Sequence, residues 1–535
     1  MHFPFDIFQL FYLLGLSFFN IGTAGLAEQE IHLTAAQPHV ALDHISFQYF
    51  QNDYLSKLLQ DNKTLVLVGA GWSESSLPKM YRVSQRQHQN RAFAPHYLLA
   101  LRYIQMGGNA KVFYLTTCPI RKDYRRFLFQ LMTGSTSEDS FSKFENESFK
   151  ILELKPPSNY DKDEPFSFLE LKNNKKKIEN LFHEMQNLKK NDNNHFLGFA
   201  LHAGGPLSQE WAEKMGIEML ANPLSLAKFG LKSVSRQSYR DCNIPHPLGT
   251  YEPVFSSSDL ALAVRKLMDL GKRKFMIKID RSALGDGNLN LEFCDCKISR
   301  SQIAEKFNKL ASESYKKRME EHGVIIEEYI EGDSFSSPSV SSFIEENGPR
   351  PYSLSEQVLG GNNGLKYTGG RGKLTKPDEN IAPVKYGKTV AEHLYYSGVK
   401  GPVGTDFVGI KKGKENLFYA VENNIRSTAT LYPYQISYSL LEGEFDGRYY
   451  HTNTHIEVKN MKSLTNRNKF SKWLYEWLPS QKLVYSKGNR KGLVVINDNI
   501  RIGLLTVLAI GETLEECNLM LQEFESAVRE YSPVN

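Results

Sequence analysis

The sequence predicts a mixed α/β and α+β protein with several domains. An apolar run at 64–71 ends in glycines, a helical pattern follows at 96–106, and a second apolar run lies at 111–115. This β-α-β order is typical of a parallel sheet. Segments at 401–407 and 420–426 read as strands with branched or aromatic residues, and they flank a polar, glycine-containing connection, which predicts an antiparallel hairpin. With 535 residues, of which 41% are hydrophobic, the chain is long enough for about three or four domains or subdomains.

We expect four segments along the chain. Residues 1–30 form a hydrophobic lead, and residues 31–222 form an α/β domain with a polar insertion near 134–194. Residues 223–436 form an α+β domain that carries the candidate site residues, and residues 437–535 form a small α+β unit. Such boundaries follow changes of periodicity and turn composition along the sequence.

The C-terminal unit is predicted to be a hairpin followed by a helix. Strands are expected at 491–497 and 500–510, joined by a tight turn at Asp498 and Asn499. A closing helix follows, and one face of it is marked by Leu514, Cys517, Leu521, Phe524 and Val528. This unit could cover a cleft or pair subunits, and it contains no recognisable catalytic group.

The hairpin at 401–426 carries the most informative side chains. Asp406 lies on the first strand, and Glu422 and Asn424 lie two residues apart on the second. Residues two apart on a strand project to the same side, so these oxygens can share one hard cation. With the neighbouring Arg426, they suit a magnesium ion that bridges nucleotide phosphates. The alternative is an ordinary exposed hairpin face whose polar residues serve solubility.

Upstream segments favour the nucleotide interpretation. Residues 274–280 read as a buried strand with Lys278 in its middle, and the loop 281–287 that follows can lay backbone amides over phosphates. Residues 324–330 read as a strand that runs into a turn, where backbone groups can pair with an adenine edge. The ordered set of lysine strand, glycine loop, hinge strand and acidic hairpin is more specific than any single motif.

In these segments the chain resembles the ATP-grasp superfamily of carboxylate-amine ligases. Within it, the chain is similar to the pre-ATP-grasp peptide ligases of the pheganomycin type. That likeness extends from about residue 65 to the C-terminus, and the segments that carry it are 232–236, 244–249, 337–340, 356–361, 426–433 and 492–528. It implies an ATP-grasp fold over 223–436, in which two α+β subdomains hold ATP between them, preceded by a pre-ATP-grasp α/β domain.

The resemblance also implies roles for the residues that match its motifs. The metal ligands would be Asp406, Glu422 and Asn424, and the transferred phosphoryl group would be steadied by Arg426, Arg371 and Lys278. The implied nucleotide-binding residues are Lys232, Lys278, Ser282, Gly285, Gly287, Glu327, Glu328, Ile330 and Asp333. Among these, the lysines and the 282–287 loop would contact phosphates, and residues 327, 328 and 330 would line the adenine pocket.

Two positions depart from the superfamily pattern. Many members carry a glutamate two residues beyond the hinge glycine, where it meets the ribose, whereas this chain has Ser334 there and Asp333 one residue earlier. Small residues commonly follow the arginine of the metal motif, whereas residues 427–430 read Ser-Thr-Ala-Thr. The ribose contacts and the shape of the acceptor pocket are therefore left open.

The activity that the resemblance implies is ATP-dependent amide or peptide bond formation through an acyl phosphate. ATP and Mg2+, with Mn2+ as an alternative ion, would be the cofactors, and the products would include ADP and phosphate. The substrates would be a small carboxylate and an amine, of amino acid or peptide type. Phosphoryl transfer needs positioning and charge neutralisation more than a nucleophilic side chain. An ATP-grasp kinase with a small-molecule acceptor and a non-catalytic nucleotide-binding protein are the alternatives.

Other classes of function find less support. The net charge of +5, from 65 basic and 60 acidic residues, is too close to balance to indicate nucleic-acid binding. The Gly69-Ala70-Gly71 sequence lacks the third glycine of a dinucleotide fingerprint. Five scattered cysteines argue against a disulfide framework. His202, in a predicted turn, is expected to be structural rather than a substrate contact.

The N-terminal lead permits more than one interpretation. Residues 8–19 are apolar and precede small residues, as in a secretory signal. The residues before this run, however, include Asp6 and contain no lysine or arginine. The run is too short for a convincing membrane-spanning helix. Because the implied reaction consumes ATP, we expect a cytoplasmic enzyme, with export, membrane association and a homo-oligomeric state left open.

Overall fold

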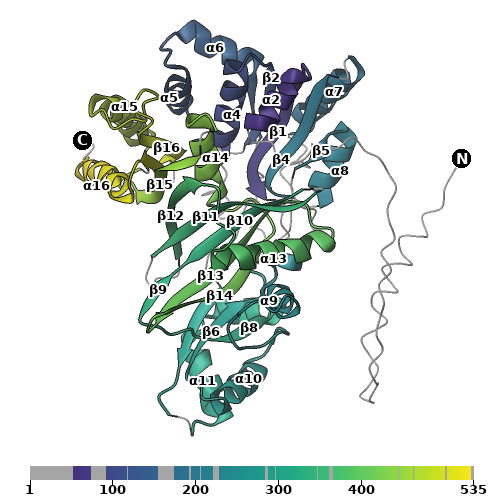
Figure 1. The fold of residues 1–535 in the computed structure, drawn as a ribbon, viewed down its shortest axis with the longest axis vertical. Helices are drawn as coiled ribbons and strands as arrows, with labels where there is room; N and C mark the ends of the chain where they lie inside the picture. The colour runs from purple at the N-terminus through teal and green to yellow at the C-terminus, as the bar shows by residue number, and fades with distance from the viewer. Residues whose placement is uncertain are drawn as a thin grey trace, which may run out of the picture. The chain divides into compact units, whose positions relative to one another are not determined.

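The computed structural model describes residues 52–73, 92–116, 119–154, 174–191, 194–204, 206–220, 228–282, 287–295, 297–345, 347–360, 366–443, 445–461, 463–500 and 503–531 (Figure 1). The hydrophobic lead at 1–30 lies outside these ranges. Within them, no helix combines the length and the apolar character that crossing a membrane requires.

The N-terminal domain is built on a parallel sheet of five strands in the order β3-β2-β1-β4-β5. Its strands are β1 (Thr64–Ser73), β2 (Ala110–Thr116), β3 (Phe149–Glu153), β4 (His195–Ala203) and β5 (Glu218–Met219). Its helices are α2 (Asn52–Gln60), α4 (Phe93–Gln105), α5 (Lys122–Thr133), α6 (Glu138–Glu147), α7 (Lys175–Asn191) and α8 (Pro206–Met215). The β-α-β unit predicted at 64–115 is confirmed.

The run of apolar residues in β1 reflects burial on both faces of this sheet. Leu65 and Leu67 belong to one core cluster, whereas Val66 and Val68 belong to another on the opposite face. Strands covered by helices on both faces need continuous rather than alternating apolar sequence. Helix α4 is buried on nearly all sides, because it packs between the sheet and α14 (Leu431–Leu440) of the next domain.

The segment near 134–194, which we expected to be a polar insertion, contributes regular elements to this domain. It supplies edge strand β3, which pairs with β2, and helices α6 and α7. In α7, Ile178, Leu181 and Met185 recur at helical spacing and pack into the core cluster that contains Val66. Because lysines and asparagines surround these positions, the overall composition of the segment is polar and does not reveal its narrow apolar stripe. Residues 155–173 lie outside the described ranges.

A small antiparallel sheet, called here the small sheet, has the order β7-β6-β8. Its strands are β6 (Lys274–Ile279), β7 (Asn288–Glu292) and β8 (Val324–Glu328), and its helices are α10 (Ser257–Asp269), α11 (Arg300–Leu310) and α12 (Glu313–His322). Each of these helices begins after a serine, Ser256, Ser299 or Ser312, whose side chain accepts a backbone N–H bond. Such caps satisfy otherwise unpaired N–H groups and fix where each helix starts.

A large sheet of nine strands forms the centre of the protein. Its order is β14-β13-β10-β11-β12-β15-β17-β16. The short strand β9 pairs with the second half of β13, beyond the residues of β13 that pair with β10. The strands are β9 (Ser334–Ser336), β10 (Pro338–Glu345), β11 (Gly348–Gly360), β12 (Lys366–Thr375), β13 (Gly401–Lys412), β14 (Glu415–Asn424), β15 (Asp446–Glu457), β16 (Gly492–Asn499) and β17 (Leu504–Gly511). The helices are α9 (Lys232–Asp241), α13 (Ala382–Tyr396), α15 (Leu464–Ser480) and α16 (Leu514–Glu530), together with α14. The hairpin predicted at 401–426 is confirmed as β13 and β14.

The residues after 437, which we expected to form a unit of their own, continue the large sheet. Strand β15 pairs with β12, and β17 and β16 follow in the same sheet. The tight turn predicted at Asp498 and Asn499 is wrong, because both residues pair with β17 and the connection lies at 500–503. Gly503 adopts a positive φ of 72° there, and a β-carbon would lie 2.6 Å from the carbonyl oxygen of Val458.

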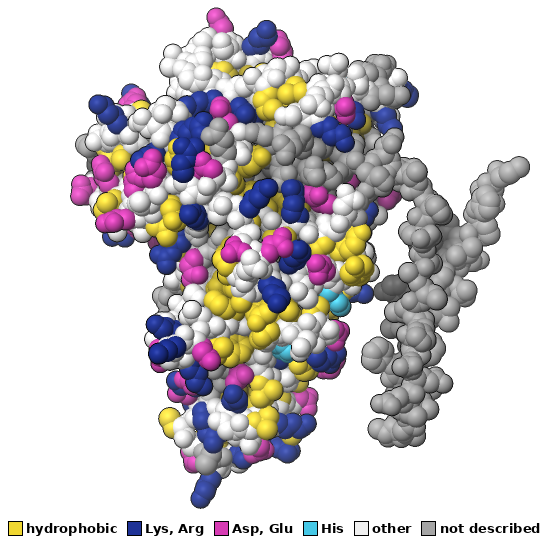
Figure 2. Space-filling view, viewed as in Figure 1, with side chains coloured by type: hydrophobic (Ala, Val, Ile, Leu, Met, Phe, Trp, Pro, Cys, Tyr) yellow, Lys and Arg dark blue, Asp and Glu magenta, His cyan; other side chains and the backbone are white. Residues whose placement is uncertain are grey.

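Charged side chains of both signs are interspersed on the face of the molecule that Figure 2 shows. The near balance of 65 basic and 60 acidic residues in the sequence is thus also visible locally. Interspersed charges favour solubility and do not create a strong field of one sign.

The buried histidine of β15 makes stability depend on pH. His451 is 2% exposed, and burial lowers its pKa to about 4. An unfolded histidine takes up a proton near pH 6.5, whereas folded His451 does so only near pH 4. The folded state therefore keeps its full stability above about pH 6.5 and loses it as the pH falls through this window.

We expect His451→Gln to reduce the acid sensitivity of folding. From about pH 7 to about pH 5, protonation of unfolded His451 should cost the folded state about 2 kcal/mol, which the variant avoids. Urea unfolding at both pH values measures this difference. His96 is also buried, and burial lowers its pKa to about 4. The stability of the variant should therefore still fall in part as the pH decreases. Equal pH dependence of the two proteins would contradict the prediction.

Candidate functional site

A cavity of about 470 Å3 lies between the small sheet and the large sheet. The small sheet contributes residues of β6, β7 and β8. The large sheet contributes residues of β9 to β14, and the segment 426–430 after β14 closes one end. Because the walls come from two separate sheets, a ligand in this cavity would contact both at once. A concave space of this size is typical of small-molecule sites.

The three predicted metal ligands lie together at one end of the cavity. Asp406 is directly opposite Glu422 in the register of β13 and β14. The amide nitrogen of Asn424 donates to Oδ2 of Asp406 at 3.0 Å, and Nη2 of Arg426 donates to Oδ1 of Asn424 at 2.7 Å. All four residues line the cavity. The antiparallel register thus brings together side chains that are up to 20 positions apart in the sequence.

The electrostatics at this end of the cavity favour a cation. Burial raises the pKa of Asp406 to about 6, and the neighbouring Glu422 carboxylate adds to the increase. Two neighbouring carboxylates that are partly shielded from water repel each other, and a divalent ion between them would relieve that repulsion. Asn424 could offer its amide oxygen to the same ion if the amide turned over and released Arg426.

The donor set fits magnesium shared with a phosphate ligand. Within the described ranges, no group of three or more His, Cys, Asp and Glu side chains is placed to hold a metal ion. The hairpin therefore offers two carboxylates and one amide, Asp406, Glu422 and Asn424. Magnesium typically takes only one or two carboxylates and completes its shell with water and substrate phosphates.

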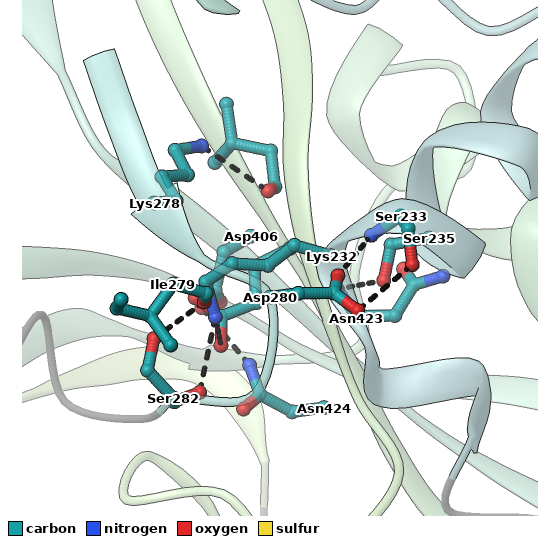
Figure 3. Close-up of polar contacts among 12 residues, drawn as sticks. Lys232, Ser233, Ser235, Lys278, Ile279, Asp280, Ser282, Asp406, Asn423 and Asn424 are labelled. Carbon is teal, nitrogen blue, oxygen red and sulfur yellow. Dashed lines mark hydrogen bonds and ion pairs between the residues drawn. The ribbon is translucent and has the colours of Figure 1, made fainter. Parts of the chain in front are cut away.

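The two predicted phosphate lysines reach this region from different elements. Lys232, the first residue of α9, donates to Oε1 of Glu422 at 3.3 Å and to the carbonyl oxygen of Ser282 at 3.0 Å (Figure 3). Lys278 lines the cavity from β6 and forms an ion pair with Glu327 at 2.6 Å. Lys232 is not among the lining residues. The structure thus presents Lys278 to a ligand and uses Lys232 to join the loop to the hairpin.

The hinge residues Glu327, Glu328 and Ile330 all line the cavity. Glu328 does not present a free carboxylate, because it accepts a bond from the backbone N–H of Leu248 at 2.9 Å and pairs with Lys272. The carboxylate of Glu327 is also bonded, as described below. Apolar residues complete this end of the cavity, among them Met276, Phe335 and Val408. A slot with apolar walls and a strand edge suits a flat, aromatic group such as a purine.

Asp333 and Arg371 lie outside the cavity lining. The carboxylate of Asp333 accepts a bond from the backbone N–H of Gly413 at 3.1 Å, in the turn between β13 and β14. Arg371 is exposed on β12, opposite Glu356, which does line the cavity. The structure therefore places Asp333 outside the cavity lining and leaves Arg371 beside the cavity.

The predicted phosphate loop is described only at its two ends. The hydroxyl of Ser282 donates to the carbonyl oxygen of Ile279 at 3.0 Å. At Gly287, a β-carbon would lie 2.5 Å from Oγ of Ser282, so the ends of the loop approach closely. Gly285 lies in the stretch 283–286, outside the described residues.

Two buried polar residues behind the site were not predicted. Asp280, directly after β6, accepts bonds from the backbone N–H and hydroxyl of Ser233 at 2.7 and 3.0 Å (Figure 3). Asn423 accepts from Tyr239 at 3.0 Å, and its backbone N–H donates to Ser235 at 3.3 Å. Both fix α9 against the strands that carry the site. A polar residue in or directly after a buried strand was the available signal for each.

Comparison with known proteins assigns this region. Residues 299–430, from the start of α11 through the β13–β14 hairpin and the segment that follows it, match the family model of the ATP-grasp domain. This part of the chain is similar to the ATP-grasp domain. The fold class predicted from the sequence is thereby confirmed, and the cavity is lined by residues of the matched range and by residues that precede it.

One curated relative and several solved structures are similar to the chain. The L-propargylglycine--L-glutamate ligase of Streptantibioticus cattleyicolor is 28% identical over 209 residues, which are 38% of this chain and 41% of that protein. The biotin carboxylase domain of Hydrogenobacter thermophilus 2-oxoglutarate carboxylase, in complex with MgADP, is 10% identical at a TM-score of 0.48, covering 88% of this chain and 90% of that one. PurK, an N5-carboxyaminoimidazole ribonucleotide synthetase, is 12% identical at a TM-score of 0.48, covering 88% and 97%. The chain thus matches less than half the length of its curated relative.

We expect Asp406→Asn to abolish the stabilisation of the ATP-grasp domain by Mg2+ and ATP together. At about a hundredfold excess over the dissociation constant, bound ligand should stabilise the wild type by about 3 kcal/mol. The variant loses a carboxylate that the ion needs, whereas the ligand-free protein should fold at least as well, because a buried like-charge pair is removed.

Thermal unfolding with ATP, in the presence of either MgCl2 or EDTA, measures this effect. Asp269→Asn is the control, because that carboxylate is 58% exposed on α10 and lies outside the cavity lining. An undiminished MgATP shift in Asp406→Asn would mean that the ion binds elsewhere.

Proposed function

We propose that the protein is an ATP-dependent ligase that joins a carboxylate to an amine through an acyl phosphate. The observation that supports this most directly is the layout of the cavity. Asp406, Glu422 and Asn424 line the cavity beside Arg426, and the hinge residues and several apolar side chains line the same cavity. A nucleotide placed with its base in the slot would direct its phosphates toward the acidic hairpin.

The chemistry requires few protein groups. A carboxylate oxygen of the acid attacks the γ-phosphorus, a new P–O bond forms, and the bond to the β-phosphate bridging oxygen breaks to release ADP. Bound magnesium would neutralise phosphate charge during this transfer. Lys278 would hold phosphate oxygens from β6, and Arg426 would steady the transferred group from the hairpin. Preorganised charges of this kind supply most of the rate enhancement in phosphoryl transfer.

The second step forms the amide bond. The amine nitrogen attacks the acyl carbon, the C–N bond forms, and the C–O bond to phosphate breaks, so that phosphate leaves and the amine loses a proton. Residues 428–430, at the phosphate end of the cavity, would contact the acceptor. Excluding water there protects the acyl phosphate from hydrolysis.

Amino acids or short peptides are the substrate class that we propose. The curated relative is named for joining L-propargylglycine and L-glutamate, two amino acids. Because the chain matches 41% of that protein, its activity and substrates are transferred here only as a proposal. Since the reaction would consume ATP, we infer a cytoplasmic location for it.

We expect hydroxylamine to trap the activated acid. Incubation of the protein with ATP, MgCl2, hydroxylamine and pooled amino acids should yield a hydroxamate that mass spectrometry detects. Glu422→Gln should lower its yield at least about a hundredfold, because the variant would lose a carboxylate that holds the Mg2+ needed to neutralise the transferred phosphoryl group.

The control for the trapping experiment is Glu415→Gln, an exposed residue at the start of the same strand β14. A phosphorylated product that accumulates without hydroxamate would indicate the kinase alternative. Nucleotide binding without any product across the pool would favour a protein without turnover.

The two arginines should differ in importance. Arg426 lines the cavity and bonds to Asn424, whereas Arg371 is exposed and outside the lining. We expect Arg426→Gln to lower kcat at least about a hundredfold and Arg371→Gln to lower it less than about tenfold. Steady-state ADP release measures both variants. Equal losses would place Arg371 at the transferred phosphoryl group as well.

A further inference from the structure

A fully buried arginine lies behind the wall of the cavity. Arg236, on α9, is 1% exposed and is not among the lining residues. Its guanidinium makes three bonds: Nε donates to the carbonyl oxygen of Thr250 at 2.7 Å, Nη2 to that of Pro247 at 2.8 Å, and Nη1 to Oε1 of Glu327 at 2.8 Å. Such an arginine is rare unless it is paired, because burying a lone charge is costly.

The partner of Arg236 links it to the cavity. The other carboxylate oxygen of Glu327, Oε2, lies 2.6 Å from the ammonium group of Lys278. Glu327 is also 1% exposed, whereas Lys278 is 8% exposed and lines the cavity. The three charged side chains come from α9, β8 and β6. Their two ion pairs form a continuous row from the interior to the cavity surface. Burial would raise the pKa of Glu327, but Lys278 and then Arg236 outweigh burial, so its pKa is lowered.

The balance of these charges determines what a ligand meets. Two cations share one carboxylate, so the group of three side chains has a net charge of plus one, and Lys278 and Glu327 both line the cavity. Without Arg236, the carboxylate of Glu327 would be matched by Lys278 alone, and the net charge would be zero. In a desolvated site, charges a few ångströms apart interact much more strongly than in water. Phosphate oxygens would then find a lysine whose charge is already neutralised.

We propose that Arg236 is a positioning residue that neutralises Glu327 from the interior and so keeps the charge of Lys278 available to the phosphates of the nucleotide. The inference rests on the nucleotide-binding part of the proposed function. It assigns Glu327 to the control of Lys278 rather than to adenine, because both carboxylate oxygens are already bonded to cations.

A purely structural role for Arg236 makes a different prediction. Its bonds to Pro247 and Thr250 fix the segment before α10, so loss of the side chain could loosen the whole nucleotide site. Loosening would weaken the binding of base and phosphates alike. A role through Lys278 would weaken phosphate binding selectively and would vanish once Glu327 is neutral.

The experiment measures binding of MgATP, MgADP and adenosine to the full chain, by calorimetry for the nucleotides and by ligand-observed NMR for adenosine. Arg236→Gln should weaken MgATP at least about tenfold and change adenosine less than about twofold, because only the phosphates interact with Lys278. The double variant Arg236→Gln with Glu327→Gln leaves Lys278 as the single charge and should recover most of the MgATP affinity. Arg240→Gln, one turn later on α9 and 54% exposed, is the matched control.

If Arg236→Gln alone does not fold, the single variant Glu327→Gln is compared with the double variant Arg236→Gln with Glu327→Gln. There the further loss of Arg236 should leave the ratio of MgATP to adenosine affinity nearly unchanged, because Arg236 acts only through Glu327. The proposal is overturned if Arg236→Gln weakens all three ligands equally, or if Arg236 retains its effect when Glu327 is neutral. A wild type that binds no MgATP would instead overturn the proposed function itself.

Discussion

The antiparallel register that places Asp406 opposite Glu422 is the constraint on which the rest of the site depends. A shift of one residue in this pairing would turn one of the carboxylates to the other face of the sheet. The register is supported from both sides. Strand β10 pairs with β13, with Ser339 opposite Asp406, and Asn423 on β14 is tied to Tyr239 and Ser235 of α9. Helix α9 thus braces the hairpin and at the same time carries Lys232 and Arg236. The same helix is anchored to the small sheet by Asp280, which accepts two bonds from Ser233. One short helix therefore sets the distance between the lysine strand and the acidic hairpin.

Local pattern was enough to predict the strands of the site and the face on which its side chains lie. Asp406, Glu422, Asn424 and Arg426 come together because residues two apart on a strand share a face and because a short polar connection favours a hairpin. Pairing between distant strands is not encoded locally. The residues after 437 join the large sheet through β12, and β3 joins the first sheet through β2, although each lies in a segment that composition alone sets apart. Strand partners of this kind depend on which edge is free when the chain folds.

Side-chain partners were the least predictable feature of the site. Asp333 was expected among the nucleotide-binding residues, but it lies outside the cavity lining and accepts a bond from the backbone N–H of Gly413 in the hairpin turn. Glu327 was expected at adenine, but its two oxygens are taken by Arg236 and Lys278. Helix α9 is strongly polar in sequence, yet Lys232, Ser235 and Arg236 are buried in it. Polar residues are buried there because their partners come from β8, β14 and the end of β6, which only the tertiary fold brings near.

The charged side chains around the cavity include equal numbers of cations and carboxylates. Four cations, Lys232, Lys278, Arg236 and Arg426, accompany four carboxylates, Asp280, Glu327, Asp406 and Glu422. Balance limits the cost of burying so many charges in the absence of a ligand. Asp406 and Glu422 on the hairpin are accompanied by Lys232 and Arg426, whereas Arg236 and Lys278 outnumber Glu327 by one. The two hairpin carboxylates would suit a divalent cation and Lys278 would suit phosphate oxygens. A cation and a polyphosphate bound together would therefore satisfy both groups, and nucleotide affinity would then depend on the metal.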